Sequence, residues 1–297
     1  MKKVNYAIGL ALLLWSSAFV GIRFSLTDYT PGSLALLRFL VASISITIIY
    51  ALLPNKKKIP WPERLQLLLI GVGSIGIYNI CLNIGELSVS AGIASFIIGI
   101  NPVLTIIFCI ILFKERTNFL VWFGVVTSMF GLLLIAMGGE YLEVRVQDVF
   151  IIFISTTMSA MYNLTQKYFL QKYHPVAVTC WVIWGGTLFL LYFLPALKQD
   201  LLTASFATTA VVVYMGIFSA TLAYVFWCYA LKKITASRAS IYTYFLPLIS
   251  TALGFLVLGE KPAPIALFGG IIALIGAIIA KQGHKNLMIP LKITHTN

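Results

Sequence analysis

The chain has 297 residues, of which 60% are hydrophobic and 10% charged, and its formal net charge at pH 7 is +12. Its mean hydropathy of +0.96 is well above what a soluble core of this size requires. Little sequence lies outside the apolar stretches, so there is no room for a soluble kinase, nucleotidase or receptor domain.

Apolar stretches follow one another along the whole chain. A transmembrane helix needs about 20 apolar residues. Stretches of this kind are predicted at residues 5–24, 32–53, 65–85, 91–113, 118–138, 147–169, 175–195, 207–230, 238–258 and 264–281. We therefore expect an all-α polytopic membrane protein with ten transmembrane helices.

The second half of the sequence repeats motifs of the first half 145 positions later. The pairs at this spacing are Ala91–Ser95 with Ala236–Ser240, Pro102 with Pro247, Glu115 with Glu260, and Gly124 with Gly269. Because five spans precede the second copy, it must cross the membrane in the opposite direction, as in many transporters. We expect two inverted five-helix repeats, at residues 1–140 and 146–283, followed by a polar cytoplasmic tail at 284–297.

Basic residues are unevenly distributed between the predicted connections. If the N-terminus is cytoplasmic, all but five of the 21 lysines and arginines fall in cytoplasmic segments; the five are Arg23, Arg38, Arg145, Lys198 and Lys261. This bias predicts that both termini are cytoplasmic. It also explains the positive charge without nucleic-acid binding, which we do not expect.

Small residues recur at helical spacing in the fifth and tenth spans. Gly124 and Ser128 lie four positions apart, and Gly269 lies in the corresponding part of the last span. Such residues let helix backbones approach closely. We interpret them as packing seams, either within a monomer or in a homodimer.

The third span carries a polar stripe. Asn79, Asn83 and Glu86 are spaced at i, i+4 and i+7, which places them on one helical face. Polar groups inside a bilayer are costly and tend to face a bundle interior or a water path. The stripe therefore predicts a substrate cavity, with hydrogen bonding between helices as the alternative.

Further polar and aromatic residues lie deep in other spans. Tyrosine and tryptophan near span ends are usually interfacial anchors, whereas deeper ones can line a pocket. The remaining candidate substrate-binding residues are Trp15, Tyr78, Asn101, Tyr162, Asn163, Tyr224, Trp227 and Tyr244.

Two prolines lie near the middle of their spans. Pro102 and Pro247 should each kink a helix and free the carbonyl four residues earlier, on Ile98 and Thr243. A freed carbonyl near the membrane centre suits a gate or binding site. A static packing kink is the alternative.

Charged residues are scarce at the predicted membrane centre. Arg38 lies about two turns into the second span, from where it could extend outward to the membrane surface, and we expect a structural role for it. Without a cation in a polar stripe, a phosphorylated substrate is disfavoured. Glu86 is the nearest approach to an intramembrane carboxylate, close to the outer surface, and is the only candidate for coupling transport to protons.

Enzyme motifs do not appear. His174, His284 and His295 all lie in predicted connections or the tail, and the zinc-protease HExxH and phosphate-binding GxxxxGK[ST] patterns are missing. We expect no catalytic activity, no cofactor and no metal site.

The chain resembles an EamA-type member of the drug/metabolite transporter superfamily over nearly its whole length. The residues that carry the resemblance are Trp15-Ser16-Ser17-Ala18-Phe19, Leu37-Arg38-Phe39, and the duplicated segments Ala91 to Glu115 and Ala236 to Glu260. The resemblance implies two inverted five-helix repeats and a central cavity lined by the first, third, fourth, sixth, eighth and ninth spans. Family members export amino acids and related metabolites or take up other small solutes.

Together these observations predict a secondary transporter in the bacterial cytoplasmic membrane. Its substrate is expected to be a small neutral or zwitterionic metabolite, with amino-acid efflux by alternating access as the first choice. An importer of a cofactor or nucleoside derivative is one alternative, and a passive channel is another. The chain could be a monomer or a homodimer.

Overall fold

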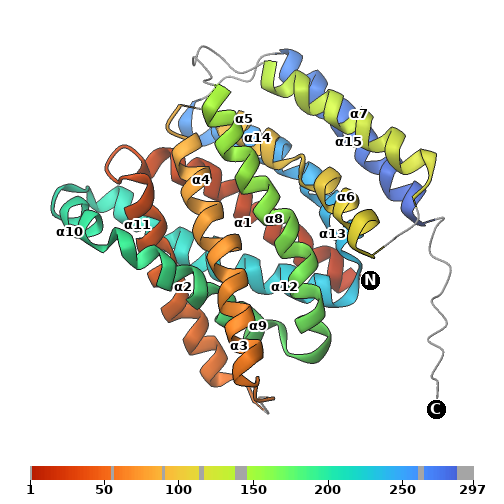
Figure 1. Cartoon of the computed structure of the whole chain (residues 1–297). Helices are drawn as coiled ribbons and strands as arrows, with labels where there is room; N and C mark the ends of the chain where they lie inside the picture. The colour runs from red at the N-terminus through yellow and green to blue at the C-terminus, as the bar shows by residue number, and fades with distance from the viewer. Residues whose placement is uncertain are drawn as a thin grey trace, which may run out of the picture.

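The computed structural model describes residues 2–54, 57–88, 91–113, 117–137, 146–259 and 264–285, and every regular element within these ranges is a helix (Figure 1). The first half of the chain contains α1 (Lys2–Ser25), α2 (Pro31–Leu52), α3 (Trp61–Gly71), the π-helical segment η1 (Val72–Ile77), α4 (Tyr78–Gly85), α5 (Ala91–Ile98), α6 (Asn101–Phe113) and α7 (Phe119–Met137).

The second half begins with the long helix α8 (Val146–Lys172). It continues with α9 (Pro175–Leu190), the 3₁₀ segment η2 (Leu191–Phe193), α10 (Leu194–Thr203), α11 (Phe206–Tyr214), the π-helical segment η3 (Met215–Leu222) and α12 (Ala223–Lys233). The last elements are α13 (Ala236–Ser240), the 3₁₀ segment η4 (Ile241–Phe245), α14 (Leu246–Leu258) and α15 (Pro264–Lys285).

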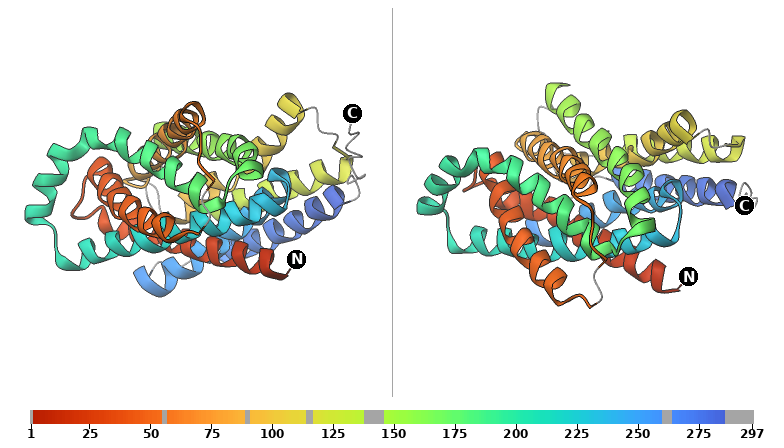
Figure 2. Two further views of the ribbon diagram at one scale, coloured as in Figure 1. Left: turned by 90° about the horizontal axis from the view of Figure 1, so that it is seen from below. Right: turned by 60° about the horizontal axis from the view of Figure 1, so that its bottom comes forward.

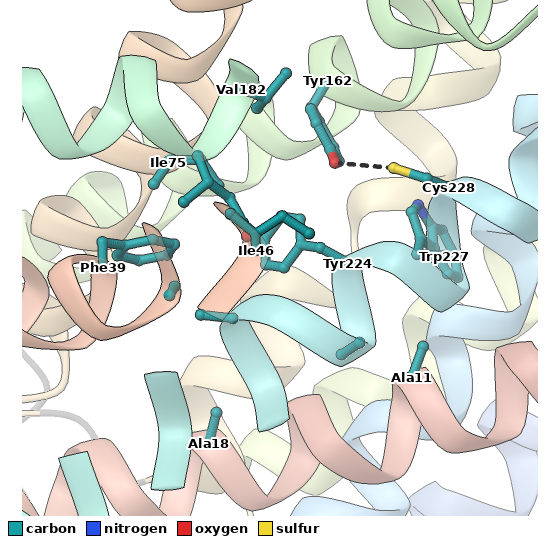
Figure 3. Packing of buried hydrophobic residues seen from close by; sticks show 14 of the residues in the cluster. Ala11, Ala18, Phe39, Ile46, Ile75, Tyr162, Val182, Tyr224, Trp227 and Cys228 are labelled. Carbon is teal, nitrogen blue, oxygen red and sulfur yellow. Dashed lines mark hydrogen bonds between the residues drawn. The ribbon is translucent and has the colours of Figure 1, made fainter. Parts of the chain in front are cut away.

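Six helical stretches in the described part of the chain are long and apolar enough to cross a membrane. They are Lys2–Ser25, Pro31–Leu52, Trp61–Gly85, Pro175–Thr203, Phe206–Lys233 and Arg238–Leu258. Buried side chains of these stretches form one apolar cluster together with residues of α5 and α8, and part of this cluster is shown in Figure 3.

Two π-helical segments lie in related positions of the two halves. Residues 72–77 of η1 lie 145 positions before residues 217–222 of η3. Wide turns of this kind are rare and often occur at functional sites. Here each interrupts a long helix beside the centre of the bundle.

Glycines next to these segments permit close helix packing. A Cβ atom at Gly71 would collide with the Val182 carbonyl oxygen of α9, and one at Gly216 would lie 2.7 Å from the Arg38 carbonyl oxygen of α2. Gly71 and Gly216 are again 145 positions apart. The two contacts bring α3 against α9 and η3 against α2.

Helices α7 and α15 form a pair at one side of the molecule (Figure 1). A Cβ atom at Gly124 would collide with the Ala280 backbone nitrogen, and one at Gly276 would collide with the Ser128 backbone nitrogen. The small residues at these positions therefore form a seam inside the chain.

Each of the two mid-span prolines stands in the first turn of a helix. Pro102 is the second residue of α6, after the turn at residues 99–100, and Pro247 is the second residue of α14, after η4. The sequence predicts a kink within one helix. The span of Pro102 is instead divided into α5 and α6, whereas the helical stretch Arg238–Leu258 continues past Pro247 and changes to the 3₁₀ segment η4 just before it. A proline in the first turn loses no helical hydrogen bond, so the break removes the strain that a kink would carry.

Two connections at one end of the bundle bind each other through aspartates. Asp28, between α1 and α2, accepts hydrogen bonds from the Ser205 backbone N–H (2.9 Å) and the Thr208 hydroxyl (2.7 Å). Asp200 in α10 accepts one from the Thr30 backbone N–H (2.8 Å). The bonds that Asp28 accepts, above all that from the Ser205 N–H, favour its charged carboxylate and lower the pKa of Asp28 to about 2.

The beginning of α1 and the end of α15 lie toward the same end of the molecule (Figure 2).

Candidate functional site

A central cavity lies where helices of both halves meet. The first half contributes Trp15, Ala18, Phe19, Ile22, Arg38, Ser74, Tyr78, Leu82, Ile98 and Asn101, and the second half contributes Ser159, Tyr162, Asn163, Tyr224, Trp227, Thr243 and Leu246.

Aromatic side chains form one wall of the cavity. The Trp15 ring centroid lies 5.5 Å from that of Tyr224 and 5.1 Å from that of Trp227, and the Tyr162 and Tyr224 centroids are 5.8 Å apart. Three of these rings, with the Tyr162 hydroxyl directed toward Cys228, are seen in Figure 3. We call Trp15, Tyr162, Tyr224 and Trp227 the aromatic wall. Its rings offer apolar area and faces that attract cations.

Amide side chains connect the aromatic wall to the first half of the chain. The Trp227 indole donates to the Asn163 Oδ1 at 2.9 Å, and the Asn163 amide donates to the Asn101 Oδ1 at 3.2 Å. The Asn101 amide in turn donates to the Ser159 hydroxyl at 2.8 Å. Because these groups are largely buried, the bonds offset the cost of placing them away from water.

Arg38 forms part of the cavity wall, which corrects the expectation that it reaches outward. Its side chain is 4% exposed. Its Nη1 donates to the Asn79 Oδ1 and its Nη2 to the Ser219 hydroxyl, both at 3.2 Å. Close packing of α2 on η3 and contact with α9 turn this face of α2 inward. Of the described residues that line the cavity, Arg38 alone carries a formal charge.

The predicted candidates fall into two groups. Seven of them line the cavity: Trp15, Tyr78, Asn101, Tyr162, Asn163, Tyr224 and Trp227. Asn79, Asn83, Tyr244, Pro102, Pro247 and Glu86 do not belong to its lining.

The polar stripe of the third span is divided between different contacts. Asn79 is fully buried behind Arg38, and its amide donates to the Ile75 carbonyl oxygen at 2.7 Å. The Asn83 amide donates to the Pro31 carbonyl oxygen at 2.9 Å, at the start of α2. The two asparagines share a helical face, but Asn79 contacts Arg38 of the cavity wall and Asn83 contacts the start of α2.

Glu86 is fully buried, although it lies just beyond the end of α4. Its backbone carbonyl accepts a hydrogen bond from Arg23 at 2.7 Å. Tyr244 is likewise fully buried, in η4.

Residues four positions before each mid-span proline line the cavity. These are Ile98 and Thr243, which are 145 positions apart, as are the lining residues Asn101 and Leu246. In each pair one member is polar and the other apolar. The duplicated segments therefore supply corresponding but chemically unlike parts of the wall.

Comparison with known proteins is consistent with this architecture. The family model described as the EamA-like transporter family matches residues 3–137 and 148–281. The chain is 32% identical to the uncharacterized transporter YdfC of Bacillus subtilis, over 99% of this chain and 96% of that protein. It is 30% identical to a protein of Streptantibioticus cattleyicolor named as a probable terminal-alkyne amino-acid exporter, over 95% of this chain and 94% of that protein. A solved crystal structure with 18% sequence identity has the same fold, with a TM-score of 0.74 over 94% of this chain and 98% of that one.

Proposed function

Because the chain belongs to the EamA-like transporter family and is therefore a membrane transporter and not an enzyme, we propose that it moves a small organic metabolite through the central cavity by alternating access. The cavity carries this proposal: both halves of the chain build it, and rocking one half against the other would expose it to each side in turn. We place the protein in the cytoplasmic membrane of a bacterium.

The proposed architecture is ten spans in two inverted five-helix repeats, residues 1–140 and 146–283, with a tail at 284–297. It is supported by structural pairs at the 145-residue spacing. Gly71 and Gly216 mediate close packing in both halves, and η1 corresponds to η3. Each half thus has a closely packed glycine and a π-helical segment at corresponding positions.

We propose that both termini are cytoplasmic. The distribution of basic residues and the position of both described chain ends at one end of the molecule support this orientation. Reporter fusions after Lys58 and Lys285 should give a cytoplasmic signal, and one after Glu143 an external signal. A cytoplasmic signal at Glu143, which lies outside the described residues, would contradict the inverted repeat.

Seven side chains are proposed to contact substrate: Trp15, Tyr78, Asn101, Tyr162, Asn163, Tyr224 and Trp227. Asn79 is proposed to position Arg38, and Pro102 and Pro247 to set the helix breaks beside the cavity. Trp15→Ala should abolish transport, because it opens the aromatic wall. Trp61→Ala is the matched control, since Trp61 is 65% exposed and lies outside the cavity.

Amino-acid export is the preferred direction and substrate class. It is supported by the mixed amide and aromatic lining and by the name of the Streptantibioticus relative, which is itself only similar to this chain. The protein in proteoliposomes should give saturable amino-acid flux that is stimulated by substrate on the opposite side. Non-saturable flux without such stimulation would instead indicate a channel, and selective uptake of a nucleoside or cofactor an importer.

A further inference from the structure

Arg38 combines a permanent charge with deep burial in a membrane protein. A guanidinium stays protonated in proteins, and a charge inside a bilayer is costly unless it is paired. The hydrogen bonds of Arg38 among the described residues go to two neutral oxygens, those of Asn79 and Ser219. Its Nε is buried and has no hydrogen-bond partner among them. The donor fork of Arg38 is thus only partly used.

No carboxylate among the described residues forms an ion pair with Arg38. Lys172 with Glu63, at 3.1 Å, is the one ion pair between described residues, and it is remote from the cavity. Glu86 contributes to the electrostatic environment of Arg38, but the two do not form an ion pair. The cavity lining therefore includes a cation whose hydrogen-bond donors are not all used.

The rest of the wall fits the other parts of an organic acid. The aromatic wall can hold an apolar group, and its ring faces attract an ammonium group. The amides of Asn101 and Asn163 can adapt to either polarity. We propose that Arg38 binds the carboxylate of the substrate and that the substrate class is amino acids and other monocarboxylates with an apolar side group. This inference rests on the proposed function and narrows it.

Charge favours a carboxylate over a phosphate ester. Guanidinium binds either group through paired hydrogen bonds. However, a phosphate ester carries nearly two negative charges at neutral pH, and Arg38 is the one charged residue of the described cavity lining. A carboxylate would be neutralised by this single cation, whereas a phosphate would bring a second negative charge into the membrane.

The test compares probes that share a phenyl group and differ in their polar group. Binding of L-phenylalanine, 3-phenylpropionate, L-phenylalaninamide, phenethylamine and phenyl phosphate to the purified full chain would be measured by calorimetry. The two carboxylates should bind. The amide and the amine should bind about 10- to 100-fold more weakly, as expected from the loss of a charge-assisted hydrogen bond. Phenyl phosphate should also bind more weakly, because it brings a second negative charge that Arg38 does not neutralise.

Variants then test whether Arg38 is responsible for the preference for carboxylates. Arg38→Gln should remove it by weakening carboxylate binding about 10- to 100-fold without changing amide binding. Arg38→Lys should keep part of it, because the charge remains and the fork is lost. Lys198→Gln is the matched control: it also removes one positive charge, from an exposed residue of α10 outside the cavity.

Three outcomes would overturn the inference: equal binding of acid and amide by the unaltered protein, failure of both carboxylates to bind, or unchanged acid preference in Arg38→Gln. The comparison of probes on the unaltered protein decides the question even if that variant does not fold. Carboxylate binding at Arg38 without carboxylate flux in proteoliposomes would contradict the proposed amino-acid export and leave the assignment of the carboxylate site to Arg38 intact. Flux of a neutral solute that does not depend on Arg38 would support transport through the cavity and contradict the carboxylate inference.

Discussion

Gly216→Ala tests the close packing that turns Arg38 inward. The added Cβ would lie 2.7 Å from both the Arg38 carbonyl oxygen and the Val41 Cβ, and real Cβ atoms essentially never approach below 3.0 Å. Neither neighbour is the end of a flexible side chain, so η3 and α2 must move apart. Overpacking of this kind costs about 1–3 kcal/mol. At about 2–4 °C per kcal/mol, the melting temperature should fall by roughly 2–12 °C.

Gly9→Ala is the matched control for this prediction. It makes the same change in α1, where an added Cβ would meet nothing within 4 Å, and alanine is the better helix former by about 1 kcal/mol. Thermal unfolding of the purified proteins in detergent should therefore separate the two variants. The reasoning is refuted if Gly216→Ala melts at or above Gly9→Ala, because the seam would then be loose enough to absorb a methyl group.

Other predictions concern single side chains. The hydrogen bonds that Asp28 accepts lower its pKa to about 2. Its stabilising effect is therefore complete above the ordinary pKa of 3.8 and is lost as the pH falls toward 2. The melting temperatures of Asp28→Asn and the unaltered protein should differ at pH 6 and converge near pH 2. Asn163→Leu strands the buried Trp227 indole donor and should cost about 1–3 kcal/mol, measured by thermal unfolding against Thr165→Val, whose hydroxyl bonds only its own helix on the exposed side. Glu86→Gln should retain counterflow in proteoliposomes, whereas loss of uphill flux driven by a pH gradient in this variant would make Glu86 the coupling residue.

Helix positions and much of the cavity could be predicted from the sequence. Apolar length alone predicted stretches close to the observed helices, because a bilayer fixes how long a spanning segment must be. Six helical stretches of the described residues are long and apolar enough to cross a membrane, and the count of ten spans stays a prediction. Trp227 and Asn163 were identifiable for a similar reason: large polar or amphipathic side chains deep in an apolar stretch have few places to go except a shared interior. The two side chains do meet in the interior, where the Trp227 indole donates a hydrogen bond to Asn163.

Arg38 could not be placed in this way. Depth along a span is readable from sequence, but rotation about the helix axis is not, and two turns from an end is near enough for an arginine to reach water. Its direction depends on the contact of Gly216 with α2, a feature of two segments far apart in the chain. The same limit explains Asn83, which shares a helical face with Asn79 but meets Pro31.

The unlike pairs in the cavity wall, Ile98 with Thr243 and Asn101 with Leu246, bear on the energetics of a transport cycle. Two identical inverted copies would make the inward-open and outward-open forms equivalent, with equal energies and equal affinities. Substituting a polar for an apolar member in each pair breaks that degeneracy, so that substrate can be held more tightly on one side than on the other. Detailed balance then requires the equilibrium between the two orientations to differ between the empty and the loaded carrier by the same factor. Asymmetry of this kind can speed release on one side of the membrane, but the solute gradients alone determine where net flux stops.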